Sequence, residues 1–277
     1  MTRIAVTGST GHIGGRVATQ LAHSGHRLRL IVRDAARAPQ QRADAELAVA
    51  DYADGDAVEK ALAGINVAFM VSAHESADRV NEHLAFVAAA QRAGVKHLVY
   101  TSFVGAGDAA GFTLARDHGA TEDAIRDSGM TYTFLRDNFY LDLLPHFADE
   151  NGVIRGPSGE GKTAAVARAD VADAAVAVLE HPEQHRDTIY ELTGGEALSL
   201  GDVARRASAA TGRRFIFINE TLDEAYASRA HYGAPAWQVE AWVSTYTAIA
   251  DGELERVTDD VRRLTGHEPR TLEDVLG

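Results

Sequence analysis

The first half of the chain alternates short apolar runs with stretches in which apolar residues recur every three or four positions. The runs are typical of buried parallel strands, and the recurring positions are typical of helices with one apolar face. We expect strands at residues 4–6, 26–32, 47–49, 67–71, 97–101 and 132–135, with helices after residue 14 and at 58–62, 80–91 and 117–127. Because strands that alternate with helices are joined by right-handed crossovers, the pattern predicts an α/β fold with a Rossmann-type, doubly wound parallel sheet.

The second half of the chain is less regular, but it carries helix-start signals. Ser199–Asp202 and Thr271–Asp274 have the spacing of capping boxes, and Asp170 is expected to cap a helix at 171–179. Further elements are expected as strands at 188–192 and 215–218 and as a helix from Pro235 onward. We therefore divide the chain into a Rossmann domain at 1–150, completed by segments returning from the C-terminal half, and a smaller α/β part at 151–277 that covers the substrate.

Three glycines, Gly8, Gly11 and Gly14, follow the first strand at a spacing of three. A turn this tight needs residues without a Cβ, and so does a backbone that approaches a pyrophosphate. The next helix would direct its free N–H groups and the positive end of its dipole toward the phosphates. An ordinary glycine-rich turn is the alternative, but the position between a strand and a helix favours a dinucleotide-binding loop. The residues expected to contact the dinucleotide here are Gly8, Thr10, Gly11, His12, Ile13 and Gly14.

The end of the second strand bears on which dinucleotide is bound. NAD-preferring folds place an acidic residue near this point to accept hydrogen bonds from the ribose 2′-hydroxyl. Here Arg33 ends the strand, and Arg37 follows one helical turn later. A guanidinium pairs well with a 2′-phosphate, so Arg33 favours NADP(H). Asp34 is contrary evidence, because its carboxylate could take the NAD role.

Polar residues also follow the later strands. Asp51 and Tyr52 come after the third strand, where an adenine base would lie. Ser72, Ala73 and His74 follow the fourth strand, and Ser102 ends the fifth. Ligands of open α/β sheets bind outside the carboxyl ends of the strands, so we expect these residues to lie near the cofactor.

Composition and charge narrow the class of protein. The chain has no cysteine, which excludes disulfides and thiolate sites, and no spacing of histidines that predicts a metal site. Its formal net charge is −13, so we expect it to bind neither nucleic acid nor anionic membranes. No apolar run is long enough to span a membrane, and the N-terminus leads directly into a strand, so we expect a cytoplasmic protein.

One motif resembles a phosphate-binding P-loop, but its surroundings do not fit one. Residues 156–163 fit the P-loop pattern Gly-x-x-x-x-Gly-Lys-Thr. A P-loop needs a buried strand before it and a helix that begins at the lysine, and the sequence predicts neither. We interpret the segment as a surface hairpin turn.

Several motifs taken together resemble the atypical short-chain dehydrogenases, and more narrowly their NmrA-like branch, which contains NAD(P)H:quinone oxidoreductases and triphenylmethane reductases. The motifs are the glycine loop at 7–14, Val-Arg at 32–33, Ala-Asp-Tyr at 50–52, Tyr-Thr-Ser at 100–102, His-Gly-Ala-Thr-Glu at 118–122, Ser-Gly at 128–129, the run at 132–140, Gly-Glu-Gly-Lys at 159–162 and Arg-Ala-Asp at 168–170. The similarity covers essentially the whole chain.

The acid pair of ordinary short-chain dehydrogenases, Tyr-x-x-x-Lys, is missing. The residues four positions before the three lysines are Asp56, Arg92 and Ser158, and the corresponding place holds Leu114 and His118. Quinones and cationic dyes are electrophilic enough to accept hydride without that pair. The resemblance therefore implies an NADPH-dependent reductase of a quinone-like or other conjugated small molecule, and the absent pair argues against an epimerase.

The resemblance also implies roles for residues near the substrate. His118 would lie beside the nicotinamide and donate to a substrate oxygen or to the ribose, although a core histidine is the alternative. Asn138 and Tyr140 would orient the substrate, whereas Phe139 serves equally well as packing. A non-catalytic NADP(H)-sensing regulator is the second hypothesis, since some members of this branch are regulators. The oligomeric state stays open, with a homodimer as one option.

Overall fold

The computed structural model describes residues 2–22, 24–39 and 45–277. The chain forms two compact units. The first comprises Met1–Ser102, Gly119–Arg136 and Val171–Tyr190, and the second comprises Phe103–His118, Asp137–Asp170 and Glu191–Gly277. Because both units are built from segments that interleave along the sequence, no single cut separates them, and the division into 1–150 and 151–277 stays a prediction.

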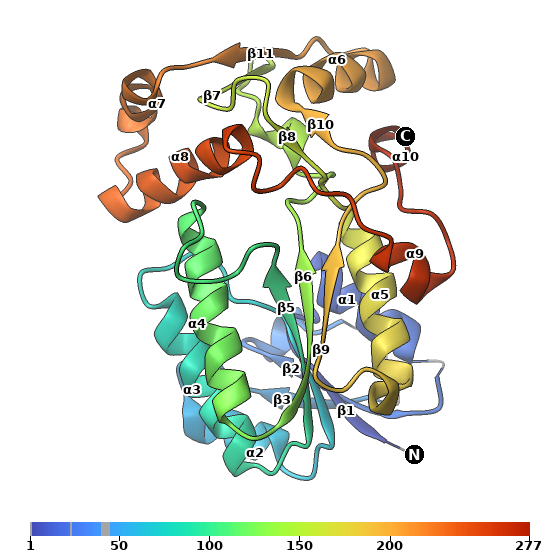
Figure 1. Cartoon of the computed structure of the whole chain (residues 1–277). Helices are drawn as coiled ribbons and strands as arrows, with labels where there is room; N and C mark the ends of the chain where they lie inside the picture. Colours follow the sequence, from blue (N-terminus) through green and yellow to red (C-terminus); the bar gives the residue numbers. More distant parts are fainter. Residues whose placement is uncertain (1, 23, 40–44) are drawn as a thin grey trace. The chain divides into compact units, whose positions relative to one another are not determined.

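The first unit is organised around a seven-stranded sheet of order β3-β2-β1-β4-β5-β6-β9. Its strands are β1 (Arg3–Val6), β2 (Arg27–Val32), β3 (Glu46–Val49), β4 (Val67–Met70), β5 (His97–Phe103), β6 (Thr131–Asp137) and β9 (Thr188–Leu192). Its helices are α1 (His12–Leu21), α2 (Gly55–Leu62), α3 (Arg79–Arg92) and most of α4 (Thr113–Asp127) and α5 (Arg168–Glu180), with short 3-10 turns η1 (Ala35–Arg37) and η3 (Pro182–Gln184). Residues 113–118 of α4 and 168–170 of α5 belong to the second unit. Figure 1 shows α2, α3 and α4 on one face of the sheet and α1 and α5 on the other. The predicted doubly wound Rossmann-type sheet is confirmed.

The central strands are apolar on both faces because helices cover both faces. All residues of β4 and β5 are buried, and β1 is buried from Ile4 to Val6. The pairings of β1 with β2 and β4, of β2 with β3, and of β4 with β5 are parallel. The strand order reverses between β1 and β4, which is where ligands of open α/β sheets bind.

The second unit contains two small two-stranded sheets and several helices. Its strands are β7 (Val153–Gly156), β8 (Lys162–Thr163), β10 (Leu198–Ser199) and β11 (Ile216–Asn219). Its helices are α6 (Leu200–Thr211), α7 (Leu222–Arg229), α8 (Ala236–Ala250), α9 (Asp260–Thr265) and α10 (Leu272–Leu276), with 3-10 turns η2 (Leu144–Phe147) and η4 (Ala230–Tyr232). The predicted capping boxes are present at Ser199 of α6 and Thr271 of α10.

Two predictions about the second half of the chain are wrong, the helix cap at Asp170 and the hairpin turn at 156–163. Asp170 does not cap a helix, because α5 already begins at Arg168 and Asp170 lies in its first turn. There its carboxylate accepts from the backbone N–H of Arg270 at 2.8 Å and pairs with the guanidinium of the same residue.

The P-loop-like segment is a loop, but not a hairpin, because β7 pairs with β11 and β8 pairs with β10. Its glycines serve packing against α8. A Cβ on Gly156 would overlap the ring of Tyr246, and a Cβ on Gly161 would overlap the carbonyl of Ile249. No helix of the part that the structure describes is long and apolar enough to cross a membrane.

Candidate active site

The loop between β1 and α1 has the geometry that its glycines predict. Gly8 has a φ of +61°, and a Cβ there would lie 3.0 Å from the Cβ of Val71. A Cβ on Gly14 would lie 2.5 Å from the carbonyl oxygens of Gly8 and Thr7, so only glycine lets α1 start this close to β1. Gly11 precedes α1 without a side-chain cap, which leaves the first N–H groups of the helix available to an anion.

Burial within this loop fits a bound dinucleotide. Thr10 and His12 are exposed, whereas Ile13 is buried. The hydroxyl of Ser9 is buried and has no hydrogen-bond partner within the described residues. Because an unpartnered buried hydroxyl is unfavourable, the loop by itself is incomplete and fits a polar ligand.

The end of β2 favours a phosphate over a ribose hydroxyl. Arg33 is exposed, and its guanidinium makes no hydrogen bond or ion pair in the described ranges. The carboxylate of Asp34 caps the 3-10 turn η1, where it accepts from the N–H of Ala36 at 2.9 Å. One oxygen of the acidic group that could bind a ribose diol is therefore engaged within the turn.

The residues after β3 make contacts within the protein. Asp51 is exposed and accepts from the N–H of Ala53 at 3.0 Å. The hydroxyl of Tyr52 lies 2.5 Å from Oγ1 of Thr7 and 2.7 Å from the carbonyl oxygen of Val71. Burial raises the pKa of Tyr52, so its hydroxyl stays protonated. The hydroxyl of Tyr52 therefore connects the ends of β1 and β4. Contact of its ring with an adenine base stays a prediction.

The end of β5 carries a buried charge network. Ser102 donates to Oε1 of Glu122 at 2.6 Å, and the side chain of Glu122 is 1% exposed. Arg136 binds both oxygens of this carboxylate, at 2.8 and 2.6 Å, and Arg126 adds a contact at 2.9 Å. Ser102 is itself fully buried, and its hydroxyl is held by Glu122 within this network.

All of the predicted cofactor residues except His118 belong to the first unit. They follow or end β1, β2, β3, β4 and β5, so the parallel sheet brings them to one edge, at its carboxyl ends. Ser72, Ala73 and His74 follow β4 at the point where the strand order reverses. This shared placement fits a dinucleotide site.

His118 lies in the second unit among aromatic rings. Its imidazole is buried and stacks on Phe103, with ring centroids 6.1 Å apart and an interplanar angle of 29°. Phe103, Phe112 and Phe139 form a triangle with centroid distances of 5.0 to 5.1 Å. An imidazole in an apolar aromatic environment can donate one directed hydrogen bond while it excludes water.

Asn138 and Tyr140 make strong contacts with the protein itself. The amide of Asn138 is 1% exposed; it donates to the carbonyl of Leu254 at 2.9 Å and accepts from the hydroxyl of Thr163 at 2.8 Å. The hydroxyl of Tyr140 donates to Oδ2 of Asp137 at 2.7 Å. The amide of Asn138 is thus engaged within the protein, while half-buried Tyr140 presents a ring and a hydrogen-bonded hydroxyl.

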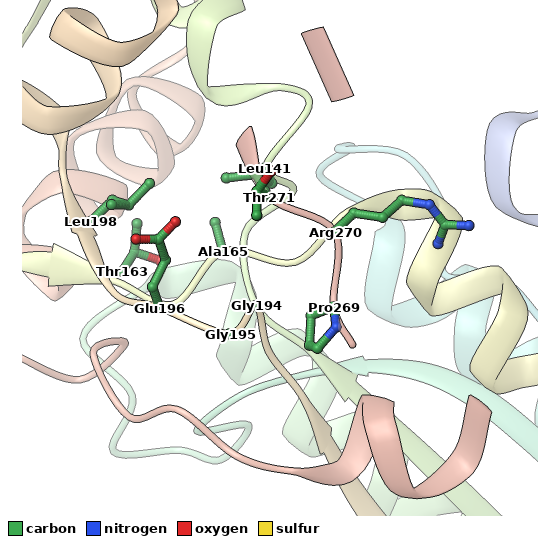
Figure 2. Close-up of a pocket in the computed structure, with 10 residues that line it drawn as sticks. All are labelled: Leu141, Thr163, Ala165, Gly194, Gly195, Glu196, Leu198, Pro269, Arg270 and Thr271. Carbon is green, nitrogen blue, oxygen red and sulfur yellow. The ribbon is translucent and has the colours of Figure 1, made fainter. Parts of the chain in front are cut away.

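A cavity of about 300 Å³ also lies within the second unit (Figure 2). It is lined by Leu141, Thr163, Ala165, Gly194, Gly195, Glu196, Leu198, Pro269, Arg270 and Thr271. Glu196 pairs with Arg206 at 2.7 Å, and Figure 2 shows Arg270 directed away from the other lining side chains. The charged lining residues are therefore engaged elsewhere, and the cavity has no evident polar anchor for a ligand.

Sequence reasoning missed the buried polar residues behind the site, His83 and Glu122 above all. His83 lies on the apolar face of α3, in line with Val87 and Ala90. A histidine among apolar positions at helical spacing is the signal that could have found it. Glu122 lies within the motif at 118–122, whose local pattern gives no sign of the charge network around its carboxylate.

Comparison with known proteins places the chain in a family. Residues 8–182 match the family model described as NAD(P)H-binding. The chain is 32% identical to an NAD(P)H azoreductase of Xenophilus azovorans, over 97% of this chain and 95% of that protein. It is also 32% identical to quinone oxidoreductase 2 of Escherichia coli strain K12, over 97% of this chain and 96% of that protein.

Similar solved structures support the same family. The NADPH complex of the Escherichia coli quinone oxidoreductase superposes with a TM-score of 0.87 at 31% identity, covering 99% of this chain and 98% of the other. The NADP(H) complex of triphenylmethane reductase from Citrobacter sp. gives a TM-score of 0.85 at 30% identity, with the same coverage. The negative transcriptional regulator NmrA, at 19% identity, shares the fold alone. The glycine cradle at the sheet edge, the family match and the full-length similarity therefore agree: the chain belongs to the NAD(P)H-binding, NmrA-like branch of the atypical short-chain dehydrogenases and is an oxidoreductase.

Proposed function

We propose that the protein is an NADPH-dependent reductase that passes hydride to a quinone-like or other conjugated small molecule. The observation that carries the proposal is the glycine cradle at Gly8, Gly11 and Gly14 in a chain that lacks Tyr-x-x-x-Lys. Reduced nicotinamide supplies a hydride, and an electrophilic conjugated acceptor takes it without a strong protein acid. The relatives named for quinones, azo compounds and triphenylmethane dyes support this class of acceptor.

NADPH is proposed over NADH because of the residues after β2. Arg33 is exposed, whereas the carboxylate of Asp34 is engaged with the N–H of Ala36. A guanidinium binds a 2′-phosphate through charge-assisted hydrogen bonds, and the cap already uses one oxygen of the carboxylate that would otherwise accept from the ribose.

On the acceptor side, we propose that His118 donates a hydrogen bond to the oxygen or nitrogen that gains electron density. The stacked ring of Phe103 and the neighbouring Phe139 support a site that accepts flat, apolar molecules. Tyr140 is proposed as an orienting residue, since Asp137 fixes its hydroxyl. Asn138 is proposed to act only through the loop that it holds, because its amide binds Leu254 and Thr163.

The assay is NADPH oxidation in the presence of quinones, azo dyes and triphenylmethane dyes, followed by the loss of reduced-nicotinamide absorbance. We expect turnover with at least one of these acceptors. NADPH binding without turnover on any acceptor would refute the reductase and favour the NADP(H)-sensing regulator.

Replacement of Arg33 tests the cofactor preference. We expect Arg33→Ala to lower kcat/KM for NADPH by about tenfold to a hundredfold, the value of a charged hydrogen-bond pair, and to leave kcat/KM for NADH unchanged. Arg27→Ala is the matched control, because Arg27 is an exposed arginine at the amino end of the same strand. An Arg33 variant that keeps its preference for NADPH would contradict the assignment.

A further inference from the structure

The backbone immediately after β4 is held by side chains. The N–H of Val71 donates to Oγ1 of Thr7 at 2.9 Å, and its carbonyl accepts from Tyr52 at 2.7 Å. The N–H of Ser72 donates to Oγ1 of Thr101 at 2.8 Å. Because these partners come from the segments after β1 and β3 and from β5, the loop after β4 depends on tertiary contacts.

Helix α3 supplies the last two contacts, both to Ala73. The N–H of Ala73 donates to Nε2 of His83 at 2.8 Å, and its carbonyl accepts from Nε of Arg79 at 3.0 Å. Both side chains are buried, at 0% and 4% exposure. Two buried polar side chains on one helix therefore hold both polar groups of a single residue.

The contacts of His83 define its protonation. Because Nε2 accepts a hydrogen bond, the proton is on Nδ1, which lies 2.9 Å from Oγ1 of Thr121. Burial lowers the pKa of His83 to about 3, so the imidazole stays neutral and remains an acceptor.

The loop that His83 holds borders the dinucleotide cradle. It follows the strand next to β1, where the strand order reverses, and the side chain of Val71 packs against Gly8. A shift of Ala73 would move Ser72 and Val71, and with them the wall of the glycine loop. The contact therefore connects a buried helix residue to the surface that meets the cofactor.

We propose that His83 is a positioning residue for the cofactor, which fixes the loop at residues 71–74 through the N–H of Ala73. The inference rests on the proposed binding of NADPH at the carboxyl edge of the sheet. It assigns to His83 no contact with the cofactor and no proton transfer. Arg79 assists by holding the carbonyl of the same residue.

The test is the dissociation constant for NADPH, measured by fluorescence titration on folded variants of the full chain. His83→Phe keeps a ring but removes the acceptor, and we expect it to weaken NADPH binding by about tenfold, the value of one buried hydrogen bond. His83→Gln restores an amide acceptor, and we expect binding within about threefold of the unmodified protein. With saturating NADPH, kcat should stay within about twofold for both variants, because the loop acts on binding.

His97→Phe is the matched control. His97 is also buried and neutral, and its two nitrogens lie 2.8 and 2.9 Å from the hydroxyls of Thr131 and Thr133. It lies at the first residue of β5, at the amino end of the sheet, so its replacement should disturb the core and leave NADPH binding unchanged. If His83→Phe does not fold, Thr121→Val is used instead, because it removes the hydroxyl that orients the imidazole; we expect a loss of about threefold.

The outcomes separate this inference from the proposed function. If the unmodified protein binds NADPH and His83→Phe, or its substitute Thr121→Val, binds it equally well, the positioning role is refuted and the proposed function stands. The positioning role is also refuted if His97→Phe weakens binding as much as His83→Phe. If the unmodified protein does not bind NADPH, the proposed function fails, and the inference fails with it.

Discussion

Acidification from pH 6.5 to about pH 5 is expected to destabilise the first unit through two buried histidines. Burial lowers the pKa of His83 to about 3 and that of His97 to about 4, from an ordinary value of 6.5. In the unfolded chain both imidazoles bind a proton near pH 6.5, whereas in the folded chain they stay neutral down to about pH 4. Below pH 6.5 the unfolded state therefore binds more protons, so the free energy of unfolding falls as the pH falls.

The expected size follows from the linkage relation. At pH 6.5 each imidazole of the unfolded chain is half protonated, so the slope rises from about 0.7 to about 1.4 kcal/mol per pH unit as the pH falls. Between pH 6.5 and pH 5 the loss is about 1.6 kcal/mol for each histidine and about 3 kcal/mol for the pair. Carboxylates with lowered pKa values, such as Glu273 at about 2, add their losses only at more acidic pH. A loss of about 3 kcal/mol is a large share of the 5–15 kcal/mol that is typical of a folded domain.

Urea titrations followed by circular dichroism at pH 6.5 and pH 5 measure this loss. Fluorescence is unsuitable, because Trp237 and Trp242 both belong to the second unit. The double variant His83→Gln/His97→Gln keeps amide partners for the same hydroxyls but cannot bind a proton, so its free energy of unfolding should change far less between the two pH values. An unmodified protein whose free energy of unfolding changes by less than about 1 kcal/mol would refute the reasoning, as would a double variant with the same pH dependence.

Three further predictions concern glycines and buried charge. Gly14→Ala should weaken NADPH binding at least about a hundredfold in a fluorescence titration, because the Cβ of the alanine would lie 2.5 Å from backbone oxygens of the cradle. Near-normal binding would contradict this prediction, since it would show that the loop can move to admit the Cβ. Glu122→Gln should lower the free energy of unfolding by about 1–3 kcal/mol, because it removes the charge of a buried carboxylate that binds Arg136 and Arg126, whereas Glu59→Gln on an exposed pair should cost less than about 1 kcal/mol in the same urea titration. Gly161→Ala should destabilise the protein by about 2 kcal/mol or more, because the glycine serves packing. Lys162→Ala, at an exposed position, should leave stability and NADPH oxidation unchanged. If Lys162→Ala instead lowers NADPH oxidation while Gly161→Ala leaves stability unchanged, a phosphate-binding role for the segment would be favoured.

Sequence patterns predicted the sheet of the first unit well, because each strand there is a local apolar run covered by helices on both faces. The predicted strands at 67–71 and 97–101 correspond to β4 and β5, and the capping boxes at Ser199 and Thr271 are confirmed. These features depend on residues a few positions apart. Asp170 shows the limit: it has the composition of a cap, but its carboxylate binds Arg270, a hundred positions away, and no local pattern reports that contact.

The features of the candidate site also fall into two groups, those that are local in the sequence and those that depend on tertiary contacts. The glycine spacing at 8, 11 and 14 and the arginine after β2 are local features, so the sequence by itself determined a Rossmann-type nucleotide fold and its family. Only the tertiary structure decided that the carboxylate of Asp34 is engaged, that Ser102 donates to Glu122, and that His83 holds the loop after β4. These contacts join strands and helices far apart in the chain. Burial gives them their strength, and burial is a property of the packed molecule rather than of any segment of the sequence.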